Sequence, residues 1–180
     1  MAEKQTTVHS VRTIILAVIG AFVLIGGWLG WYFWRSGGQV YDSLSAYLMS
    51  LPDNSLVKAK IGERTYVFEV VNTPRSITQG LSDRREIGSD GMLFAMPAKT
   101  YHSFWMPRMQ FDLDILWLDE EHIMQVMENV PAAPADASAW QIPRYTSDMP
   151  ANVVLEIPSG RAKLNNIKAG DIIEVIEVVR

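Results

Sequence analysis

The 180-residue sequence contains no cysteine. Disulfide bonds, thiolate metal sites and a cysteine nucleophile are therefore all excluded. A basic cluster is missing as well, because the charged residues before residue 35 (Glu3, Lys4 and Arg12) leave 14 basic and 19 acidic residues for the rest of the chain. A mildly acidic domain is poorly suited to neutralising phosphates, so we expect no nucleic-acid partner.

Charge is also absent from the 22 residues between Thr13 and Trp34. As a helix this run extends about 33 Å, which matches a hydrocarbon core of roughly 30 Å. Tryptophans crowd its carboxyl-terminal end, where an interfacial aromatic belt belongs. The sequence therefore predicts one transmembrane helix that contacts membrane lipid. Gly26 and Gly30 form a small-xxx-small pair through which two such helices could associate as a weak homodimer.

Flanking cations give the expected orientation of this helix. Lys4 and Arg12 precede it, whereas Arg35 is the nearest cation that follows. The positive-inside rule then predicts a cytoplasmic segment over residues 1–12 and an extracytoplasmic domain, held in the inner (cytoplasmic) membrane of the cell. A cleaved signal peptide is the alternative, but the apolar run is too long for one and no small-residue cleavage site follows it.

Residues 35–55 are predicted to form a juxtamembrane stalk. Leu44, Leu48 and Leu51 recur at helical spacing, and Pro52 stops the pattern. This pattern fits an amphipathic helix that lies on the headgroups or against the domain. It fits a plain linker helix equally well.

From Leu56 onward the apolar residues recur with the period of two that is typical of strands. Strands are expected over residues 56–61, 64–71, 91–96, 100–106, 111–118, 123–128, 152–157 and 171–179. Short helices are expected between Thr73 and Gly80 and over residues 159–165, while residues 130–150 read as a long proline-rich loop. We therefore predict one mainly β domain over residues 56–180, a compact β-sandwich or barrel with two short helices.

Several short motifs follow one another in this domain. They are Thr73-Pro74, Gly80-Leu81-x-x-Arg84, GMLF at 91–94, SFWM at 103–106, LDI at 113–115, VLEIPSG at 154–160 and Gly170-Asp171. In this order and spacing the motifs resemble those of the uncharacterised prokaryotic DUF192 family. The resemblance covers about residues 59–178. It implies a compact, mostly β fold, often behind a signal or an anchor, and it supplies no established reaction.

Asp112 and Asp114 are two apart on a predicted strand, so their side chains share a face with Cα atoms roughly 7 Å apart. Paired carboxylates can bind a cation or serve as acid and base, and together with His102 they define a hydrolase as one alternative. The interpretation we favour leaves Asp112 solvated and pairs Asp114 with Arg84. That ion pair would fix the loop after Gly80 against the sheet.

Met106 and Met109 belong to a set of nine methionines. Across a turn these two side chains can converge, and extracytoplasmic copper proteins use methionine and histidine as ligands. A soft-metal (copper) accessory protein is therefore the second alternative. Core filling by methionine is the interpretation we favour, so no cofactor is expected.

Trp140 and Tyr145 lie in the proline-rich loop, where burying them must order the loop or contact a partner. We expect this loop, with Trp105 and His102, to border the main concavity. The candidate ligand-binding residues are His102, Trp105, Arg84, Asp114, Trp140 and Tyr145. The leading hypothesis is a non-enzymatic binding or accessory module of the cell envelope, with an envelope protein or a small molecule as its partner.

Overall fold

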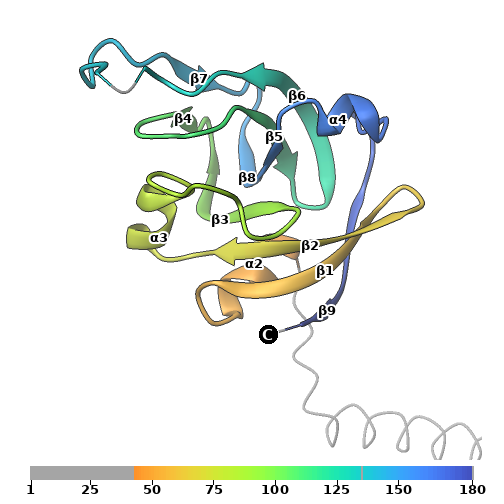
Figure 1. Cartoon of the computed structure of the whole chain (residues 1–180). Coiled ribbons are helices and arrows are strands. Elements are labelled where there is room, and N and C mark those ends of the chain that lie inside the picture. The colour runs from red at the N-terminus through yellow and green to blue at the C-terminus, as the bar shows by residue number, and fades with distance from the viewer. Residues whose placement is uncertain (1–42, 135, 180) are drawn as a thin grey trace, which may run out of the picture. The chain divides into compact units, whose positions relative to one another are not determined.

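The computed structural model describes residues 43–134 and 136–179. Within these residues the chain forms nine strands and three short helices (Figure 1). The strands are β1 (Ser55–Ile61), β2 (Arg64–Val71), β3 (Gly91–Thr100), β4 (Ser103–Trp105), β5 (Leu113–Asp119), β6 (His122–Val130), β7 (Arg144–Thr146), β8 (Ala151–Pro158) and β9 (Ile173–Val178). The helices are α2 (Leu44–Ser50), α3 (Pro74–Gln79) and α4 (Arg161–Leu164). The prediction of a mainly β domain with few short helices is confirmed.

Seven of the strands form one sheet in the order β6-β5-β8-β3-β2-β1-β9, and β4 pairs with β7 in a separate two-stranded ribbon. All neighbours are antiparallel except β2 and β3, which are joined through α3. The two edge strands of the large sheet meet at one end, where His122 bridges Ile172 and the backbone amide of Ile173 donates to the carbonyl of Glu121 at 2.9 Å. The sheet therefore curls toward a barrel.

Local signals explain why the β1–β2 hairpin and α3 form where they were predicted. Gly62 has a φ of 59°, which suits the turn between the two strands. Thr73 caps α3 by accepting a hydrogen bond from the amide of Ser76, Pro74 occupies the first turn, and Gly80 ends the helix. These two elements lead the chain from the edge of the sheet to its central strands.

The three central strands β3, β8 and β5 are buried on both faces, and two apolar cores result. The first core lies on the concave face of the curled sheet and contains Phe68, Leu93 and Leu155. The second lies on the opposite face of β3, β8 and β5 and contains Phe94 and Trp117. The loop after α3 and the β4–β7 ribbon contribute side chains to this second core. Figure 1 shows where these elements lie in the fold. The outer face of the central strands is thus covered rather than solvated.

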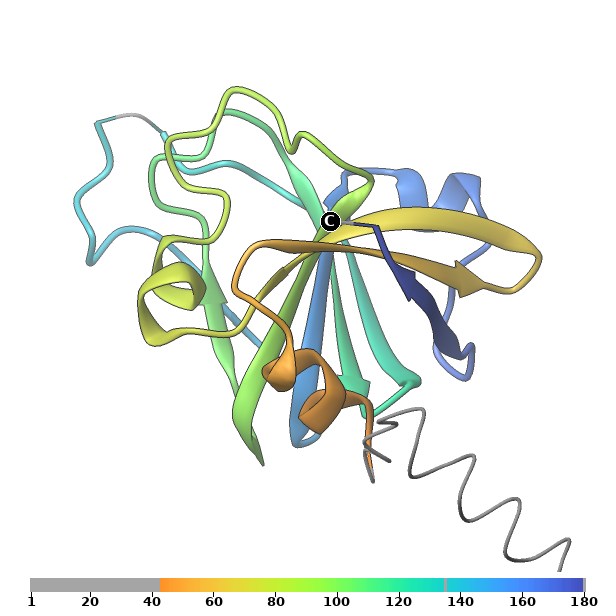
Figure 2. The ribbon, with the colours of Figure 1, turned by 90° about the horizontal axis from the view of Figure 1, so that it is seen from below.

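Helix α2 packs on the domain at one end of the strands (Figure 2). Leu48 is fully buried in the first core. The carboxylate of Glu120 accepts hydrogen bonds from the amide of Ser45 at 2.9 Å and from the side chain of Asn152. The compact unit therefore begins before Leu56, and the segment predicted as a stalk supplies one of its helices.

The predicted transmembrane helix over residues 13–34, together with Gly26 and Gly30, lies outside the described residues. Within residues 43–134 and 136–179 no helix has the length and apolar character needed to cross a membrane.

Two predicted elements differ from the structure. The strand expected over residues 100–106 is divided, because β3 continues to Thr100 and β4 begins only at Ser103. The loop expected over residues 130–150 contains the three-residue strand β7, which pairs with β4. Strands of three residues are too short to show a period of two, so their pairing depends on tertiary contacts.

Candidate functional site

A cavity of about 230 Å³ lies between the central strands and their cover. Three methionines and three aromatic residues form most of its apolar wall, namely Met96, Met106, Met109, Phe94, Phe104 and Trp105. The exposed residues Thr78, Gln79 and Ser103 line its outer part, so the cavity reaches solvent between α3 and the β4–β7 ribbon. Polar and apolar side chains thus share the wall of a concave site, and concave sites are common locations for small-molecule binding.

Glu156 is the one acidic residue among those that line the cavity, and no lysine or arginine is among them. It lies on β8 between two apolar neighbours, Met92 of β3 and Ile115 of β5. Residues that lie directly opposite on neighbouring strands point to the same face, so the carboxyl group projects into the second core. Only 5% of the Glu156 residue is exposed to solvent.

The Glu156 carboxyl has no hydrogen-bond or ion-pair partner in residues 43–134 and 136–179. Burial alone raises the pKa of this carboxyl from 4.5 to about 8. At neutral pH the group is therefore mostly protonated, and it presents a hydrogen-bond donor to the cavity. The carboxyl faces the cavity, where a ligand or water can hydrogen-bond to it, so this position is a candidate site for an outside partner.

The strand β8 must approach β3 very closely to hold Glu156 at this place. A Cβ atom added at Gly91 would stand 2.5 Å from the carbonyl oxygen of Glu156 and 2.8 Å from the side chain of Ile157. No side chain fits there, so the glycine of the GMLF motif sets the spacing of the strands below the cavity.

Aromatic rings form a connected wall beside this carboxyl. Phe104 meets Phe94 edge to face with ring centroids 5.1 Å apart, and it meets Trp117 in the same geometry at 6.5 Å. The guanidinium of Arg144 lies 4.6 Å from the ring centroid of Trp105. These contacts tie the β4–β7 ribbon to the sheet and fix the rings around the cavity.

Two cations near the cavity are held in ion pairs. Arg84 forms a two-pronged ion pair with Glu69, at 2.6 and 2.8 Å, and this contact raises the pKa of the Arg84 guanidinium. Arg108 is likewise bound to Asp83 at 2.9 Å. Neither cation is therefore free to neutralise Glu156.

Two of the predicted ligand-binding residues, His102 and Trp105, line the cavity together. His102 lies in the connection between β3 and β4 rather than inside a strand, and its Nε2 atom hydrogen-bonds with the carbonyl of Ala98 at 2.8 Å. The methionines Met106 and Met109 flank a turn, across which the sequence predicted that they could converge, and both line the same cavity. Both are also core residues, which agrees with the interpretation we favoured for them.

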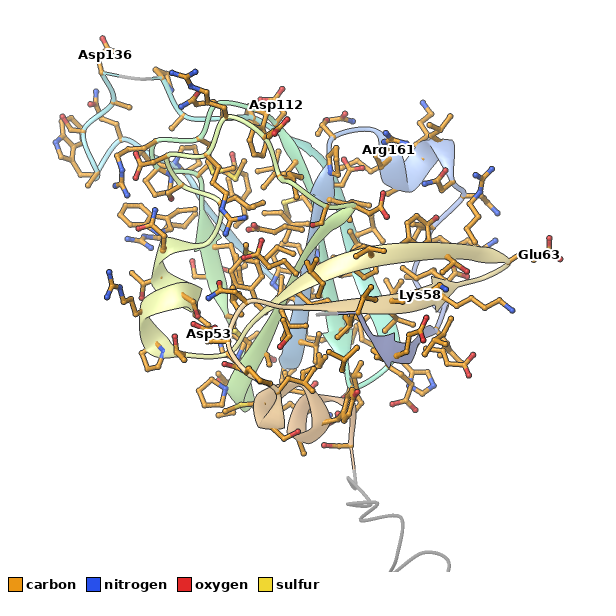
Figure 3. All side chains as sticks on the ribbon, turned by 60° about the horizontal axis from the view of Figure 1, so that its bottom comes forward. Asp53, Lys58, Glu63, Asp112, Asp136 and Arg161 are labelled. Atoms are coloured by element: carbon orange, nitrogen blue, oxygen red, sulfur yellow. The ribbon has the colours of Figure 1, made fainter. Side chains whose placement is uncertain are left out.

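The proline-rich loop contributes less than predicted. Trp140 is 84% exposed and is not among the residues that line this cavity. Asp136, in the same loop, lies far out on the surface (Figure 3). Tyr145 packs against the second core through β7 and pairs with Phe104, but it does not line the cavity either.

The predicted Arg84–Asp114 ion pair is wrong. Arg84 pairs with Glu69 because the parallel β2–β3 arrangement brings β2, and not β5, beside the loop after α3. Asp114 is fully buried and accepts hydrogen bonds from the backbone amides of Asn129, Gly160 and Ala162 at 2.9, 3.1 and 2.9 Å. It therefore caps the start of α4 and holds the turn after β8.

The carboxylates of the hydrolase alternative do not converge either. Asp112 lies before β5 at the periphery of the domain (Figure 3), where it accepts a hydrogen bond from the amide of Ala132. Asp114 is saturated by backbone amides, and His102 lines a cavity that neither aspartate reaches. The described residues also contain no group of three or more His, Asp or Glu side chains arranged to hold a metal ion.

Sequence reasoning missed Glu156, although its signal was visible. It is the one charged residue in the apolar strand Ala151–Pro158, whose residues before Pro158 are all buried. A lone carboxyl inside such a strand predicts either a paired charge or a functional group.

Comparisons with known proteins agree with the motifs and the fold. The family model described as DUF192, an uncharacterised ACR, matches residues 57–175, as the motifs predicted. A crystal structure from Sinorhizobium meliloti 1021, of a protein provisionally described as a transcription regulator, is 26% identical with a TM-score of 0.59, and the match covers 70% of this chain and 98% of that one. A crystal structure of a protein of unknown function from Novosphingobium aromaticivorans DSM 12444 is 24% identical with a TM-score of 0.56, covering 76% of this chain and 99% of that one. A search of curated proteins finds no match.

Proposed function

This chain belongs to the DUF192 family of uncharacterised proteins, and from that premise we propose that it is a membrane-anchored, non-enzymatic module that binds a small ligand in the cavity beside Glu156. The observation that carries this proposal is the Glu156 carboxyl at the wall of the cavity, without a hydrogen-bond or ion-pair partner among the described residues. A ligand that hydrogen-bonds to Glu156 removes the cost of leaving that group unpaired. The apolar wall then supplies most of the binding energy, while Glu156 supplies selectivity.

The location of this module is proposed from the sequence. The uncharged run over residues 13–34 is long enough to cross a bilayer, and the cations around it favour an extracytoplasmic domain. A carboxyl-terminal alkaline phosphatase fusion to the full chain should be active, and alkaline carbonate should leave the chain in the membrane fraction. An inactive fusion, or release by carbonate, would refute the anchored extracytoplasmic placement.

Soft-metal binding is the second candidate function, because three methionine thioethers line one cavity. The hydrogen bond between His102 Nε2 and the carbonyl of Ala98 leaves Nδ1 of the ring available as a further soft donor. Copper(I) titration of the full-length chain distinguishes this candidate. Tight binding that Met109→Leu abolishes and Met124→Leu leaves intact favours the metal, whereas equal behaviour of both variants refutes it.

Small-ligand binding is tested by nuclear magnetic resonance on the full-length chain with ¹³C-methyl methionine. Met96, Met106 and Met109 report on the cavity, whereas Met124 and Met149 lie outside its lining. Ring compounds in neutral, cationic and anionic forms should shift the cavity methyl signals for at least one charge class. Glu156→Gln should weaken that binding about tenfold, since the hydrogen bond between the ligand and the carboxyl group is lost or altered.

The matched control is Glu174→Gln, the same substitution at an exposed position on β9. It should leave the affinity unchanged. Compounds that shift all five methyl signals alike, or that bind Glu156→Gln as tightly as the native chain, would refute the cavity as the site.

A further inference from the structure

The charge distribution of the cavity says more about its ligand than the shape does. We infer that the ligand is an organic ammonium ion, a primary or secondary amine on an apolar body, whose charge pairs with the Glu156 carboxylate inside the cavity. This inference rests on the proposed function, because it names the class of ligand that the same cavity takes. Three properties of the cavity support the inference, namely the charges it contains, the side chains in its wall and its volume.

An anionic ligand is disfavoured by the charges around the cavity. No lysine or arginine is among its lining residues, and the nearby Arg84 and Arg108 are held by Glu69 and Asp83. The charge of an anionic ligand would therefore meet no lysine or arginine in the lining of the cavity, and a charge that is buried without an opposite charge is costly. The cavity offers a position for one positive charge.

A cation gains more from this cavity than a neutral ligand does. Ionised Glu156 and an ammonium group form a charge-assisted hydrogen bond, which is roughly twice as strong as a hydrogen bond between neutral groups. The rings of Phe94, Phe104 and Trp105, and the sulfur atoms of the methionines, are polarisable and attract a cation at short range. The acid and the wall thus favour the same ligand charge.

The size of the cavity limits the apolar part of the ligand. An engineered apolar cavity of about 150 Å³ holds one benzene molecule. The cavity beside Glu156 measures about 230 Å³. It therefore has room for one ring with a short chain, or for an alkyl chain of similar volume, so that 2-phenylethylamine is a suitable probe.

Binding of the amine must release a proton. The ammonium form of the ligand enters, the Glu156 carboxyl gives its proton to solvent, and the resulting carboxylate pairs with the ammonium group. Other titratable groups on the elements around the cavity include Arg75, His102, Arg144 and Tyr145. Arg84 and Glu69, Arg108 and Asp83, and Lys99 and Asp119 form ion pairs. Proton release therefore belongs to Glu156 and is removed by Glu156→Gln.

Isothermal titration calorimetry on the full-length chain tests the inference with two probes of one shape, 2-phenylethylamine and the neutral 2-phenylethanol. At pH 7 in buffers of different ionisation heat, the amine should release close to one proton for each molecule bound, and the alcohol none. The affinity for the amine should rise about tenfold for each pH unit up to pH 8 and then level off. Its preference over the alcohol at pH 8, about tenfold, should disappear in Glu156→Gln and persist in Glu174→Gln.

The possible results separate this inference from the proposed function. If the alcohol binds as tightly as the amine at pH 8, with no proton released and with dependence on Glu156, the ammonium inference is overturned and the cavity remains a ligand site. If neither probe binds at millimolar concentration, both are overturned. A preference for the amine that survives in Glu156→Gln would also overturn the inference, because another group would then recognise the charge.

Discussion

Replacing Glu156 by glutamine should make the domain more stable at neutral and alkaline pH. The folded chain holds this carboxyl protonated up to about pH 8, whereas the unfolded chain ionises it near pH 4.5. Between these two values the unfolded state binds fewer protons than the folded state, so the free energy of unfolding falls as the pH rises. Glutamine has a similar shape and does not titrate. The free energy of unfolding of Glu156→Gln therefore does not fall in this way as the pH rises.

The magnitude follows from the difference between the two pKa values of the Glu156 carboxyl. A tenfold change in an acid dissociation constant corresponds to about 1.36 kcal/mol, so the full rise from 4.5 to about 8 amounts to about 5 kcal/mol. As a neutral acid, Glu156 makes its full contribution to the free energy of unfolding below pH 4.5. That contribution falls as the pH rises and is lost by about pH 8. At pH 7 roughly 3 kcal/mol of it has gone, and the Glu156→Gln variant should gain that amount relative to the native chain.

Urea denaturation of the full-length chain between pH 5 and pH 9, followed by circular dichroism, measures this difference. The stability advantage of Glu156→Gln should grow by about 1.4 kcal/mol for each pH unit up to pH 8 and then stay constant. The exposed control Glu174→Gln should change the free energy of unfolding by less than about 0.5 kcal/mol at every pH. A pH-independent difference between the native chain and Glu156→Gln, or a variant that is less stable at pH 8, would show that burial does not hold Glu156 in its protonated form.

Three further predictions concern the supports of the site. Gly91→Ala should lower the free energy of unfolding by about 1–3 kcal/mol in the same urea assay, because the added Cβ atom would stand 2.5 Å from the carbonyl oxygen of Glu156. An unchanged urea midpoint would contradict this prediction. Asp114→Ala should lower the free energy of unfolding by about 3–5 kcal/mol, since it leaves three backbone amides without their acceptor. Asp112→Ala leaves one exposed amide without its acceptor and should lower the free energy of unfolding by less than about 1 kcal/mol. Leu48→Ala should cost about 2–5 kcal/mol because the side chain is fully buried, whereas a cost near that of the exposed Met49→Ala would show that α2 is only a linker.

Elements with local determinants were predictable from the sequence. The β1–β2 turn needs only a glycine flanked by alternating residues, and Gly62 supplies it. Helix α3 needs a cap, a proline in its first turn and a glycine at its end, all of which lie within eight residues. The predicted bounds agree with the structure because no distant contact is needed to define these elements.

Elements that depend on distant contacts were missed or misplaced. The strands β4 and β7 have three residues each and exist because they pair across some forty residues of chain. The partner of Arg84 depends on the strand order of the sheet, which no local pattern contains. Asp114 was expected to pair with a cation, but its three partners are backbone amides on β6 and at the turn into α4.

Some residues of the candidate site were likewise predictable from the sequence, whereas others depend on distant contacts. His102 and Trp105 were predicted to border the concavity together with the proline-rich loop, and both line the cavity. Trp140 of that loop was predicted to border it as well but is solvent-exposed, since its loop extends from the domain instead of folding over it. Glu156 was visible in its motif, but its isolation only becomes apparent once the apolar neighbours Met92 and Ile115 are in place.

The ¹³C chemical shift of the Glu156 side-chain carboxyl at pH 7, assigned by comparison with Glu156→Gln, tests the central claim most directly. In the unliganded full-length chain we expect the chemical shift of a protonated carboxyl, because burial without a partner holds its pKa near 8. Saturation with 2-phenylethylamine should move it to the chemical shift of a carboxylate. A carboxyl that is already ionised at pH 7 without ligand, or that ring compounds of any charge leave unchanged, would contradict the account.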